Sequence, residues 1–298
     1  MDVAISGASG LIGSALTESL VADGHRVLKL TRGGVTGDDA IGWDPEAGRI
    51  DAPGLEGLDA IVHLAGEGIG EKRWSDEQKK KILDSRVRGT AVLAAAVASR
   101  ERKPRVFVSG SAIGYYGSCG NNVLTEDSPP GTDYLAQVCV AWEAQTKAAI
   151  EAGVRTVITR TGIVLDAHGG ALAKMLLPFK LGIGGRQGSG KQWMSWVALA
   201  DEVGAIRHAI DNESVSGPIN IVAPNPVTNA DFAHALGEAL HRPTVLPTPL
   251  LPLKVRLGSE LVESLLLASQ RGKPAQLEAT GYEFRYDTLA AALEAILS

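Results

Sequence analysis

The stretch SGASGLIGSAL, Ser6–Leu16, places three glycines between an apolar run and an apolar helical pattern. Glycine permits a tight turn, close approach of the backbone to a phosphate, and close packing of a helix against a strand. The N-terminus of the following helix adds free N–H groups and a partial positive charge. This context predicts that the turn binds the diphosphate of a dinucleotide. The residues expected there are Gly7, Ser9, Gly10, Leu11, Ile12 and Gly13.

Short apolar runs alternate with longer helical patterns through the first half of the chain. Apolar residues at helical spacing predict helices over Leu11–Ala22 and Asp76–Ser99, and a third that opens at Tyr134. The runs expected to form buried strands are Val3–Ser6, Val27–Thr31, Ala60–Leu64, Val106–Ser109 and Thr156–Thr159. Such alternation predicts an α/β fold built on a Rossmann-type, doubly wound parallel sheet.

The alternation loosens after residue 166. Asn229 is expected to cap one of the later helices, and the four prolines of Pro243–Pro252 predict an extended segment. The later elements expected are helices at Ala200–Ile210, Asn229–Ala239, Leu253–Ser269 and Leu289–Leu297 and a strand at Ile219–Val222. We therefore expect a dinucleotide-binding Rossmann domain over 1–165 and a smaller α/β substrate or lid domain over 166–298. Part of 198–224 is expected to return to the first domain.

The second expected strand ends in LKLTR, Leu28–Arg32. An acidic residue at this place would hold the two adenosine ribose hydroxyls of NAD. The guanidinium of Arg32 suits a 2′-phosphate instead. The sequence therefore predicts NADP(H) as the cofactor, with a solvated surface arginine as the alternative.

Composition and charge exclude several classes of protein. The chain has 298 residues, of which 45% are hydrophobic, and a net charge of −5, which disfavours a nucleic-acid-binding surface. No apolar run approaches the roughly 20 residues that span a bilayer. Two cysteines, Cys119 and Cys139, are too few for a disulfide framework and fit a reducing compartment. We expect a cytoplasmic protein that binds small molecules and neither nucleic acid nor membrane.

Beyond the glycine turn, several motifs make the chain resemble the extended short-chain dehydrogenase/reductase superfamily. More narrowly, it resembles an atypical group of NAD(P)-dependent epimerase/dehydratase proteins, which are nucleoside-diphosphate-sugar epimerase-like, partly labelled cell-division-inhibitor-like, and carry a C-terminal domain of unknown function. The motifs are HLAGE (His63–Glu67), KRW (Lys72–Trp74), SRVRGT (Ser85–Thr90), SGSAIGYYG (Ser109–Gly117), RTGIVL (Arg160–Leu165), QWMSWV (Gln192–Val197) and GYEFRY (Gly281–Tyr286).

The resemblance implies roles for the matching positions. Ser111, after the strand at Val106–Ser109, is expected to hydrogen-bond a substrate carbonyl or hydroxyl. Arg86 stands where extended members usually carry asparagine, and Ala198 where relatives often have histidine. A homodimer through the helices that follow the strands at Ala60 and Val106 is also implied. The further residues expected at the cofactor are Leu64, Ala65, Gly66, Glu67, Arg86, Ser109 and Arg160.

The tyrosine–lysine pair of active superfamily members is missing. Tyr134 opens its helix, but the residue four positions later is Val138, and a shift by one pairs Leu135 with Cys139. An unperturbed tyrosine has a pKa of about 10, which a lysine ammonium nearby would lower. Lys147 lies roughly 20 Å further along the helix axis and cannot replace that lysine.

Three interpretations of the chemistry stay open. Tyr115 or Tyr116 could supply a hydroxyl, or these rings could only line the pocket. A charged residue after the strand at Ala60–Leu64, namely Glu67, Lys72 or Arg73, could reach into the cleft. In the third interpretation the protein binds cofactor without performing chemistry. The candidate catalytic residues are Ser111, Tyr116 and Tyr134.

Other reactive side chains fit structural roles. Cys139 lies on an apolar helical stripe, and His63 precedes the end of an apolar strand, so both are expected in the core. No histidine, cysteine or carboxylate shows metal-ligand spacing, and no metal is expected. We expect an oxidoreductase or epimerase that transfers hydride between NADP(H) and a small polar, sugar-like substrate. The alternative is a non-catalytic NADP(H) sensor.

Overall fold

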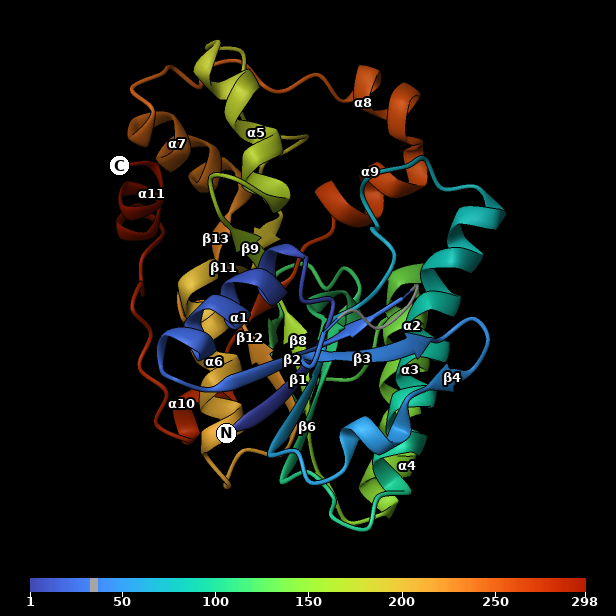
Figure 1. Ribbon diagram of the computed structural model, residues 1–298. Coiled ribbons are helices and arrows are strands. Elements are labelled where there is room, and N and C mark those ends of the chain that lie inside the picture. The colour runs from blue at the N-terminus through green and yellow to red at the C-terminus, as the bar shows by residue number, and fades with distance from the viewer. Residues whose placement is uncertain (33–36) are drawn as a thin grey trace.

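A large sheet forms the centre of the computed structural model, which describes residues 1–32 and 37–298. Its strand order is β12-β8-β6-β5-β1-β2-β3-β4, and every neighbouring pair is parallel except β3 and β4 (Figure 1). The strands are β1 (Asp2–Ser6), β2 (Arg26–Thr31), β3 (Ala40–Asp44), β4 (Arg49–Ile50), β5 (Ala60–His63), β6 (Val106–Ala112), β8 (Arg155–Thr161) and β12 (Gly217–Ile221). The chain leaves β1 towards β2 on one side and towards β5 on the other, so the loops after β1 and β5 flank a crevice. The predicted Rossmann-type fold is confirmed.

Helices cover both faces of this sheet. Strand residues alternate between them: Val3 and Ile5 of β1 pack with α1 and α6, whereas Ala4 packs on the side of α2 and α4. Each face therefore has its own apolar core. The helices are α1 (Leu11–Ala22), α2 (Asp76–Ala98), α3 (Tyr134–Glu143), α4 (Lys147–Glu151), α5 (Gly170–Lys180), α6 (Leu199–Asp211), α7 (Asn229–Ala239), α8 (Leu250–Leu257), α9 (Ser259–Leu266), α10 (Ala275–Ala279) and α11 (Leu289–Leu297).

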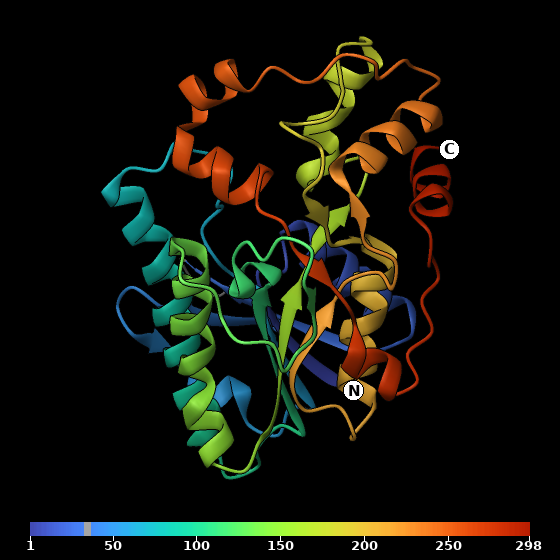
Figure 2. The same ribbon diagram turned by 180° about the vertical axis from the view of Figure 1, so that it is seen from behind.

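Much of the second half gathers at the carboxyl end of the sheet, where α5, α7, α8, α9 and α11 lie (Figure 2). Helices α5, α7 and α11 share a separate apolar core that includes Phe179, Trp196 and Phe232. The short strands are β7 (Val123–Leu124), β9 (Ile163–Leu165), β10 (Trp193–Met194), β11 (Trp196–Ala198), β13 (Val227–Thr228) and β14 (Arg271–Gly272). Between them the chain returns to the main sheet, because α6 packs against it and β12 pairs with β8.

Several predicted element boundaries are wrong. The strand β3 was not predicted, and β6 continues past Ser109 because its pairing with β8 extends to Ala112. Asn229 does not cap α7: Thr228 does, in a reciprocal capping box with Asp231, while the Asn229 carboxamide oxygen accepts a hydrogen bond from the Gln187 N–H.

The segment after residue 243 also differs from prediction. Helix α8 begins at Leu250, inside the stretch expected to be extended, since Pro252 lies in a first turn where a missing N–H is tolerated. The single helix expected over Leu253–Ser269 is two helices, α8 and α9. They separate at Gly258, whose φ of 92° is incompatible with a helix. None of the helices in the described ranges combines the length and the apolarity that a bilayer span requires.

Candidate functional site

The glycine turn between β1 and α1 is packed too closely for larger residues. Gly7 has a φ of 72°, and a Cβ there would lie 2.9 Å from the Leu64 carbonyl carbon and the Ala65 nitrogen. A Cβ on Gly13 would lie 2.2 Å from the Gly7 carbonyl oxygen. The turn is therefore pressed against the end of β5 on one side and against its own helix on the other.

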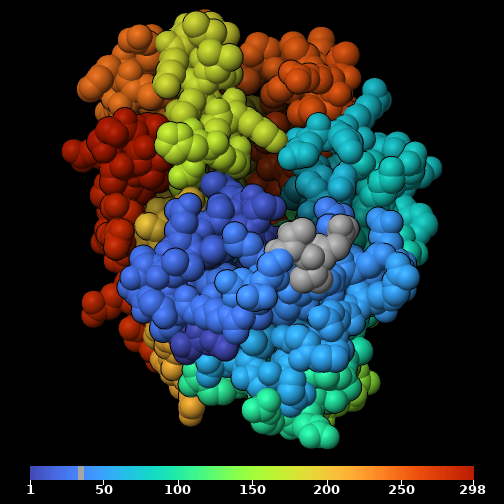
Figure 3. Space-filling view, viewed as in Figure 1, coloured from blue at the N-terminus to red at the C-terminus, as the bar shows by residue number. Residues whose placement is uncertain are grey.

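The N-terminus of α1 has the properties of an anion site. Its capping residue, Gly10, provides no side-chain hydrogen bond, and the first turn holds no acidic residue. The first N–H groups of a helix have no partner within it, so those of Leu11, Ile12 and Gly13 suit the oxygens of a diphosphate. The residues present thus fit a dinucleotide. In Figure 3 the surface is hollowed where this turn (blue), α5 (yellow-green) and the segment before α2 (cyan) meet.

Arg32 lies one residue beyond β2, exposed to solvent at the carboxyl edge of the sheet. A shallow pocket of about 360 Å³ opens beside it, lined by Thr31, Asp44 and Arg49 among others. Arg32 thus follows the second strand of the sheet, the position from which a Rossmann fold contacts the adenosine ribose.

Arg86 of α2 is hydrogen-bonded to the loop that follows β5. Arg86 donates to the carbonyl oxygens of Glu67 (2.9 Å) and Ile82 (3.2 Å), and its guanidinium lies 5.1 Å from the centre of the Trp142 ring. A Cβ on Gly66 would come within 3.3 Å of the guanidinium carbon. Burial lowers the pKa of Arg86. The contacts of Arg86 with Gly66 and Glu67 therefore fix the position of this loop.

The carboxylate of Glu67 forms a hydrogen bond and an ion pair with neighbouring side chains. It accepts a hydrogen bond from the Gln78 amide and pairs with Lys72 at 3.5 Å, and these contacts lower the pKa of Glu67. The Ser85 hydroxyl accepts from the Glu67 N–H. These bonds fix the loop that would lie along one side of the cofactor.

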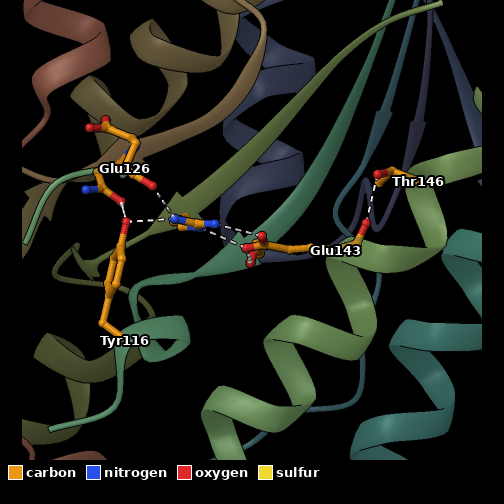
Figure 4. A network of polar contacts seen from close by, with 7 residues as sticks. Tyr116, Glu126, Glu143 and Thr146 are labelled. Atoms are coloured by element: carbon orange, nitrogen blue, oxygen red, sulfur yellow. Dashed lines mark hydrogen bonds and ion pairs between the residues drawn. The ribbon is translucent and has the colours of Figure 1, made fainter. Parts of the chain in front are cut away.

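Ser111 lies inside β6, where its hydroxyl donates to Glu143 Oε1 at 2.6 Å. Glu143, at the end of α3, also accepts two hydrogen bonds from Arg160, both of 2.9 Å (Figure 4). Because the hydroxyl donates its hydrogen to Glu143, the Ser111 oxygen can still accept a hydrogen bond. Sequence analysis missed Glu143, because a glutamate on an apolar helix gives no signal that a strand arginine will lie opposite.

Arg160 was expected at the cofactor, and the structure shows its side chain buried and hydrogen-bonded to the protein. Besides Glu143, it donates to the Tyr116 hydroxyl (2.9 Å) and the Glu126 carbonyl (3.1 Å), and it is only 4% exposed. Burial opposes its charge, but Glu143 outweighs burial and raises the pKa of Arg160. The buried guanidinium thus donates four hydrogen bonds inside the protein.

Tyr116 was expected to be catalytic, but it is 1% exposed. Its hydroxyl donates to Asn220 Oδ1 at 2.8 Å and accepts from Arg160, and Figure 4 shows it on the opposite side of this network from Glu143. Burial raises the pKa of Tyr116 to about 12. The Tyr116 hydroxyl is therefore hydrogen-bonded to two groups inside the protein. Tyr115 stacks on Arg160, whose guanidinium carbon is 3.5 Å from the ring centre.

Tyr134 points towards α2. Its hydroxyl donates to the Lys79 carbonyl oxygen at 2.7 Å, and burial raises the pKa of Tyr134 to about 12. The residues of α3 that face the loop after β6 are Leu135 and Cys139, which a Cβ on Gly114 would approach to 3.6 and 3.9 Å. The face of α3 next to Gly114 is therefore apolar, which agrees with the tyrosine–lysine pair being missing from the sequence.

Cys139 and His63 are core residues, as predicted. Burial raises the pKa of the Cys139 thiol to about 12 and lowers that of His63 to about 4. His63 Nδ1 lies 2.6 Å from the Ser6 hydroxyl, which links the ends of β5 and β1 beneath the crevice. Ser109 is also fully buried in β6. In the described part of the chain, no three His, Cys, Asp or Glu residues form a metal site.

Comparison with known proteins agrees with this geometry. The model of the NAD dependent epimerase/dehydratase family matches residues 3–222, and a domain of unknown function, DUF1731, matches 248–296. An epimerase family protein of Mycobacterium bovis is 44% identical over 291 residues, which cover 98% of this chain and 96% of the relative.

Two crystal structures are similar in fold and sequence. Human epimerase family protein SDR39U1, crystallised with NADPH, has a TM-score of 0.92 and 37% identity, with 100% of this chain and 99% of that chain covered. A nucleoside-diphosphate sugar epimerase of Corynebacterium glutamicum has a TM-score of 0.83 and 38% identity, and the match covers 100% of this chain and 58% of that longer one. The resemblance predicted from the motifs is confirmed, and the chain belongs to the NAD-dependent epimerase/dehydratase family.

Proposed function

We propose that the protein binds NADP(H) and exchanges hydride with a small polar substrate. The observation that carries the proposal is the open N-terminus of α1 behind a glycine turn that admits no side chain. The human relative crystallised with NADPH supports the same cofactor, and the exposed Arg32 supports the phosphorylated form. When bound, the nicotinamide supplies a two-electron hydride donor or acceptor.

Ser111 is the residue that we propose to position the substrate. Because its proton is directed to Glu143, its oxygen is available to accept a hydrogen bond. It therefore suits a substrate hydroxyl or amine more than a carbonyl oxygen. Arg160 and Glu143 orient the serine, while the hydroxyls of Tyr116 and Tyr134 donate hydrogen bonds to acceptors inside the protein.

The test combines a substrate panel with two variants. Purified protein is mixed with NADPH or NADP and a panel of carbonyl compounds, alcohols and sugar nucleotides, following both absorbance and product stereochemistry. Both readouts are needed because an epimerase returns its hydride. Ser111→Ala should lower turnover by about 100-fold or more without changing the Kd for NADPH. Tyr134→Phe, the matched control, should keep turnover. Unchanged turnover in Ser111→Ala would remove Ser111 from the mechanism.

A second candidate is a non-catalytic NADP(H) sensor. Its support is the apolar pair Leu135 and Cys139 on the face of α3 that adjoins the loop after β6. Such a protein would bind NADPH tightly and turn over no member of the panel. Separation of the two candidates needs a cofactor titration and the activity panel on the same preparation.

A further inference from the structure

The most exposed apolar side chains of the protein gather at one end of the molecule. Among the described residues, every large apolar side chain that is at least 60% exposed belongs to segment 177–183 or to segment 245–255. Both segments lie beyond the carboxyl end of the sheet (Figures 1 and 2), and Figure 3 shows them (yellow-green and orange) along the outer edge at this end. We call the following residues the apolar rim: Leu177, Leu181, Ile183, Val245, Leu246, Leu251 and Val255.

Hydrogen bonds hold the two segments side by side. The Arg242 guanidinium donates to the Lys180 carbonyl oxygen at 2.9 Å, and the Thr248 N–H donates to the Arg186 carbonyl oxygen at 2.8 Å. Helix α8 begins at Leu250, two residues after Thr248. The rim therefore belongs to one structural unit that both segments build.

Helix α8 contributes no residue to the interior. Its sequence LLPLKVRL holds four leucines and a valine, yet none of its eight residues is buried. Leu251 and Val255 are four residues apart and therefore lie on one face of the helix. An apolar face that a protein leaves in water commonly marks a site of interaction with a protein or a membrane.

Cations accompany the apolar rim, and carboxylates do not. Segments 167–200 and 239–259 contain seven lysines and arginines and no aspartate or glutamate, although the whole chain has a net charge of −5. Among these seven cations, Lys254 alone forms an ion pair within the described residues, with Glu263 at 2.9 Å. Lys180 and Arg256 are exposed. The surface is thus complementary to a partner that is both apolar and anionic.

A membrane with anionic lipids has both properties. Apolar side chains insert between the lipids, while lysine and arginine lie at the anionic head groups. A symmetric dimer through the rim would place the same cations of two copies against each other, which is unfavourable. Another protein would need a fixed surface of complementary shape, whereas a fluid lipid surface adapts to side chains that project singly.

We propose that the apolar rim binds reversibly to the surface of a membrane that contains anionic lipids. Helix α8 would lie along this surface, with Leu251 and Val255 among the lipids and Arg256 at the head groups. The proposal departs from the expectation that the chain binds no membrane. That expectation rested on the lack of an apolar run long enough to span a bilayer, and a helix that lies on the surface needs no such run.

The experiment is co-sedimentation of the full chain with two kinds of vesicle, one of phosphatidylcholine and one of equal parts phosphatidylcholine and phosphatidylglycerol. The wild type should bind the anionic vesicles about tenfold or more tightly than the neutral ones, because several cations face the head groups. Raising the salt to about 1 M should remove most of this preference, since the Debye length falls to about 3 Å.

Two double variants separate the apolar and the charged contributions. Leu251→Ser with Val255→Ser should weaken binding to anionic vesicles by about tenfold or more at both salt concentrations, because apolar insertion is lost. Lys180→Gln with Arg256→Gln should reduce the preference for anionic vesicles, because head-group attraction is lost. All four side chains are at least partly exposed or on the surface of helices without buried contacts of their own, and circular dichroism should show unchanged folding.

Matched controls make the same changes elsewhere on the surface. Val140→Ser with Ile150→Ser alters two apolar residues of α3 and α4 that are also exposed. Lys103→Gln with Lys147→Gln removes two exposed cations outside the two segments. Both controls should bind vesicles as the wild type does.

Three results would overturn the proposal: equal or absent binding of the two kinds of vesicle by the wild type, wild-type binding by Leu251→Ser with Val255→Ser, or equal losses in the controls. The molar mass in solution, measured by light scattering without vesicles, tests the other occupant. A wild-type dimer that Leu251→Ser with Val255→Ser dissociates would assign the rim to a second copy of the chain instead. None of these measurements requires the cofactor, so they test the rim whether or not NADPH binds.

Discussion

Arg160 of β8 and Glu143 of α3 form a two-point ion pair in the interior, with Nε–Oε1 and Nη2–Oε2 distances of 2.9 Å. The Arg160 side chain is 4% exposed and that of Glu143 is 11% exposed. The same carboxylate accepts a hydrogen bond from the Ser111 hydroxyl. The pair therefore joins a strand to a helix and also orients the residue that we propose to contact the substrate.

Replacement of Glu143 by glutamine should destabilise the protein. The change leaves a shielded guanidinium without its counter-charge, which typically costs about 3–5 kcal/mol. We expect the midpoint of urea unfolding to fall accordingly, with an unchanged m-value. Lys147→Ala is the matched control, because Lys147 pairs with Glu151 on the surface, where such pairs contribute about 0–1 kcal/mol. Similar losses in the two variants would contradict a special role for the interior pair.

Arg32→Ala should change the choice of cofactor. If Arg32 binds the 2′-phosphate, the Kd for NADPH should rise about tenfold or more, since charge-assisted hydrogen bonds are lost. The Kd for NADH, which has no such phosphate, should stay within about twofold. Fluorescence titration of both cofactors measures this. Arg102→Ala, an exposed arginine in the loop before β6, serves as the control. Equal effects on NADPH and NADH would disprove the assignment of Arg32.

Gly13→Ala should disrupt the diphosphate site. The new Cβ would lie 2.2 Å from the Gly7 carbonyl oxygen, so the turn and the helix must move apart. We expect a loss of about 1–3 kcal/mol in stability and a rise of at least about tenfold in the Kd for NADPH. Gly24→Ala, at the other end of α1, meets no atom within 4 Å. Its φ of 78° adds only about 1–2 kcal/mol of local strain, and NADPH affinity should be retained.

Glu202 of α6 should make stability depend on pH. It is fully buried, its Oε1 accepts from the Thr161 hydroxyl at 2.8 Å, and its Oε2 has no hydrogen-bond partner among the described residues. Burial raises the pKa of Glu202 from 4.5 to about 8. Between these values the folded state holds a proton that the unfolded state has released. The contribution of Glu202 to stability is therefore complete below pH 4.5 and is lost as the pH rises towards 8.

The corresponding variant is Glu202→Gln, whose side chain has a similar shape and does not ionise. Relative to this variant, the wild type should lose up to about 1.4 kcal/mol per pH unit through that window. Chemical unfolding at pH 5 to 9 measures the difference, with exposed Glu18→Gln as control. A constant difference between wild type and Glu202→Gln across this range would show that Glu202 does not titrate there.

Local patterns were sufficient to predict much of the fold. Apolar runs and helical spacing located β1, β2, β5 and α1, because burial on both faces of a parallel sheet requires such runs. The strand β3 was missed, since its sequence AIGWD is short and carries glycine and aspartate. The start of α8 was predicted at Leu253 and lies at Leu250, because prolines usually oppose a helix, although one in the first turn does not.

Some candidate site residues could be predicted from neighbouring residues in the sequence, and others could not. The turn at Gly7–Gly13 acts through its own backbone, so adjacent residues contain the whole signal. Arg160 and Tyr116 were assigned to the cleft from their places after strands. Their partners, Glu143 and Asn220, come from distant segments of the chain, and a local sequence pattern does not predict such contacts.

The sequence by itself determined the parallel sheet, the glycine turn and the absence of a tyrosine–lysine pair on α3, because each depends on residues within a few positions of one another. Only the tertiary structure decided which polar groups are available to a ligand. It satisfied Arg160, Tyr116 and Tyr134 inside the protein and, among the residues that the structure describes, left the buried Nε of Arg271 without an acceptor. The physical reason is that a hydrogen-bond donor is free or engaged according to what the fold brings within about 3 Å of it.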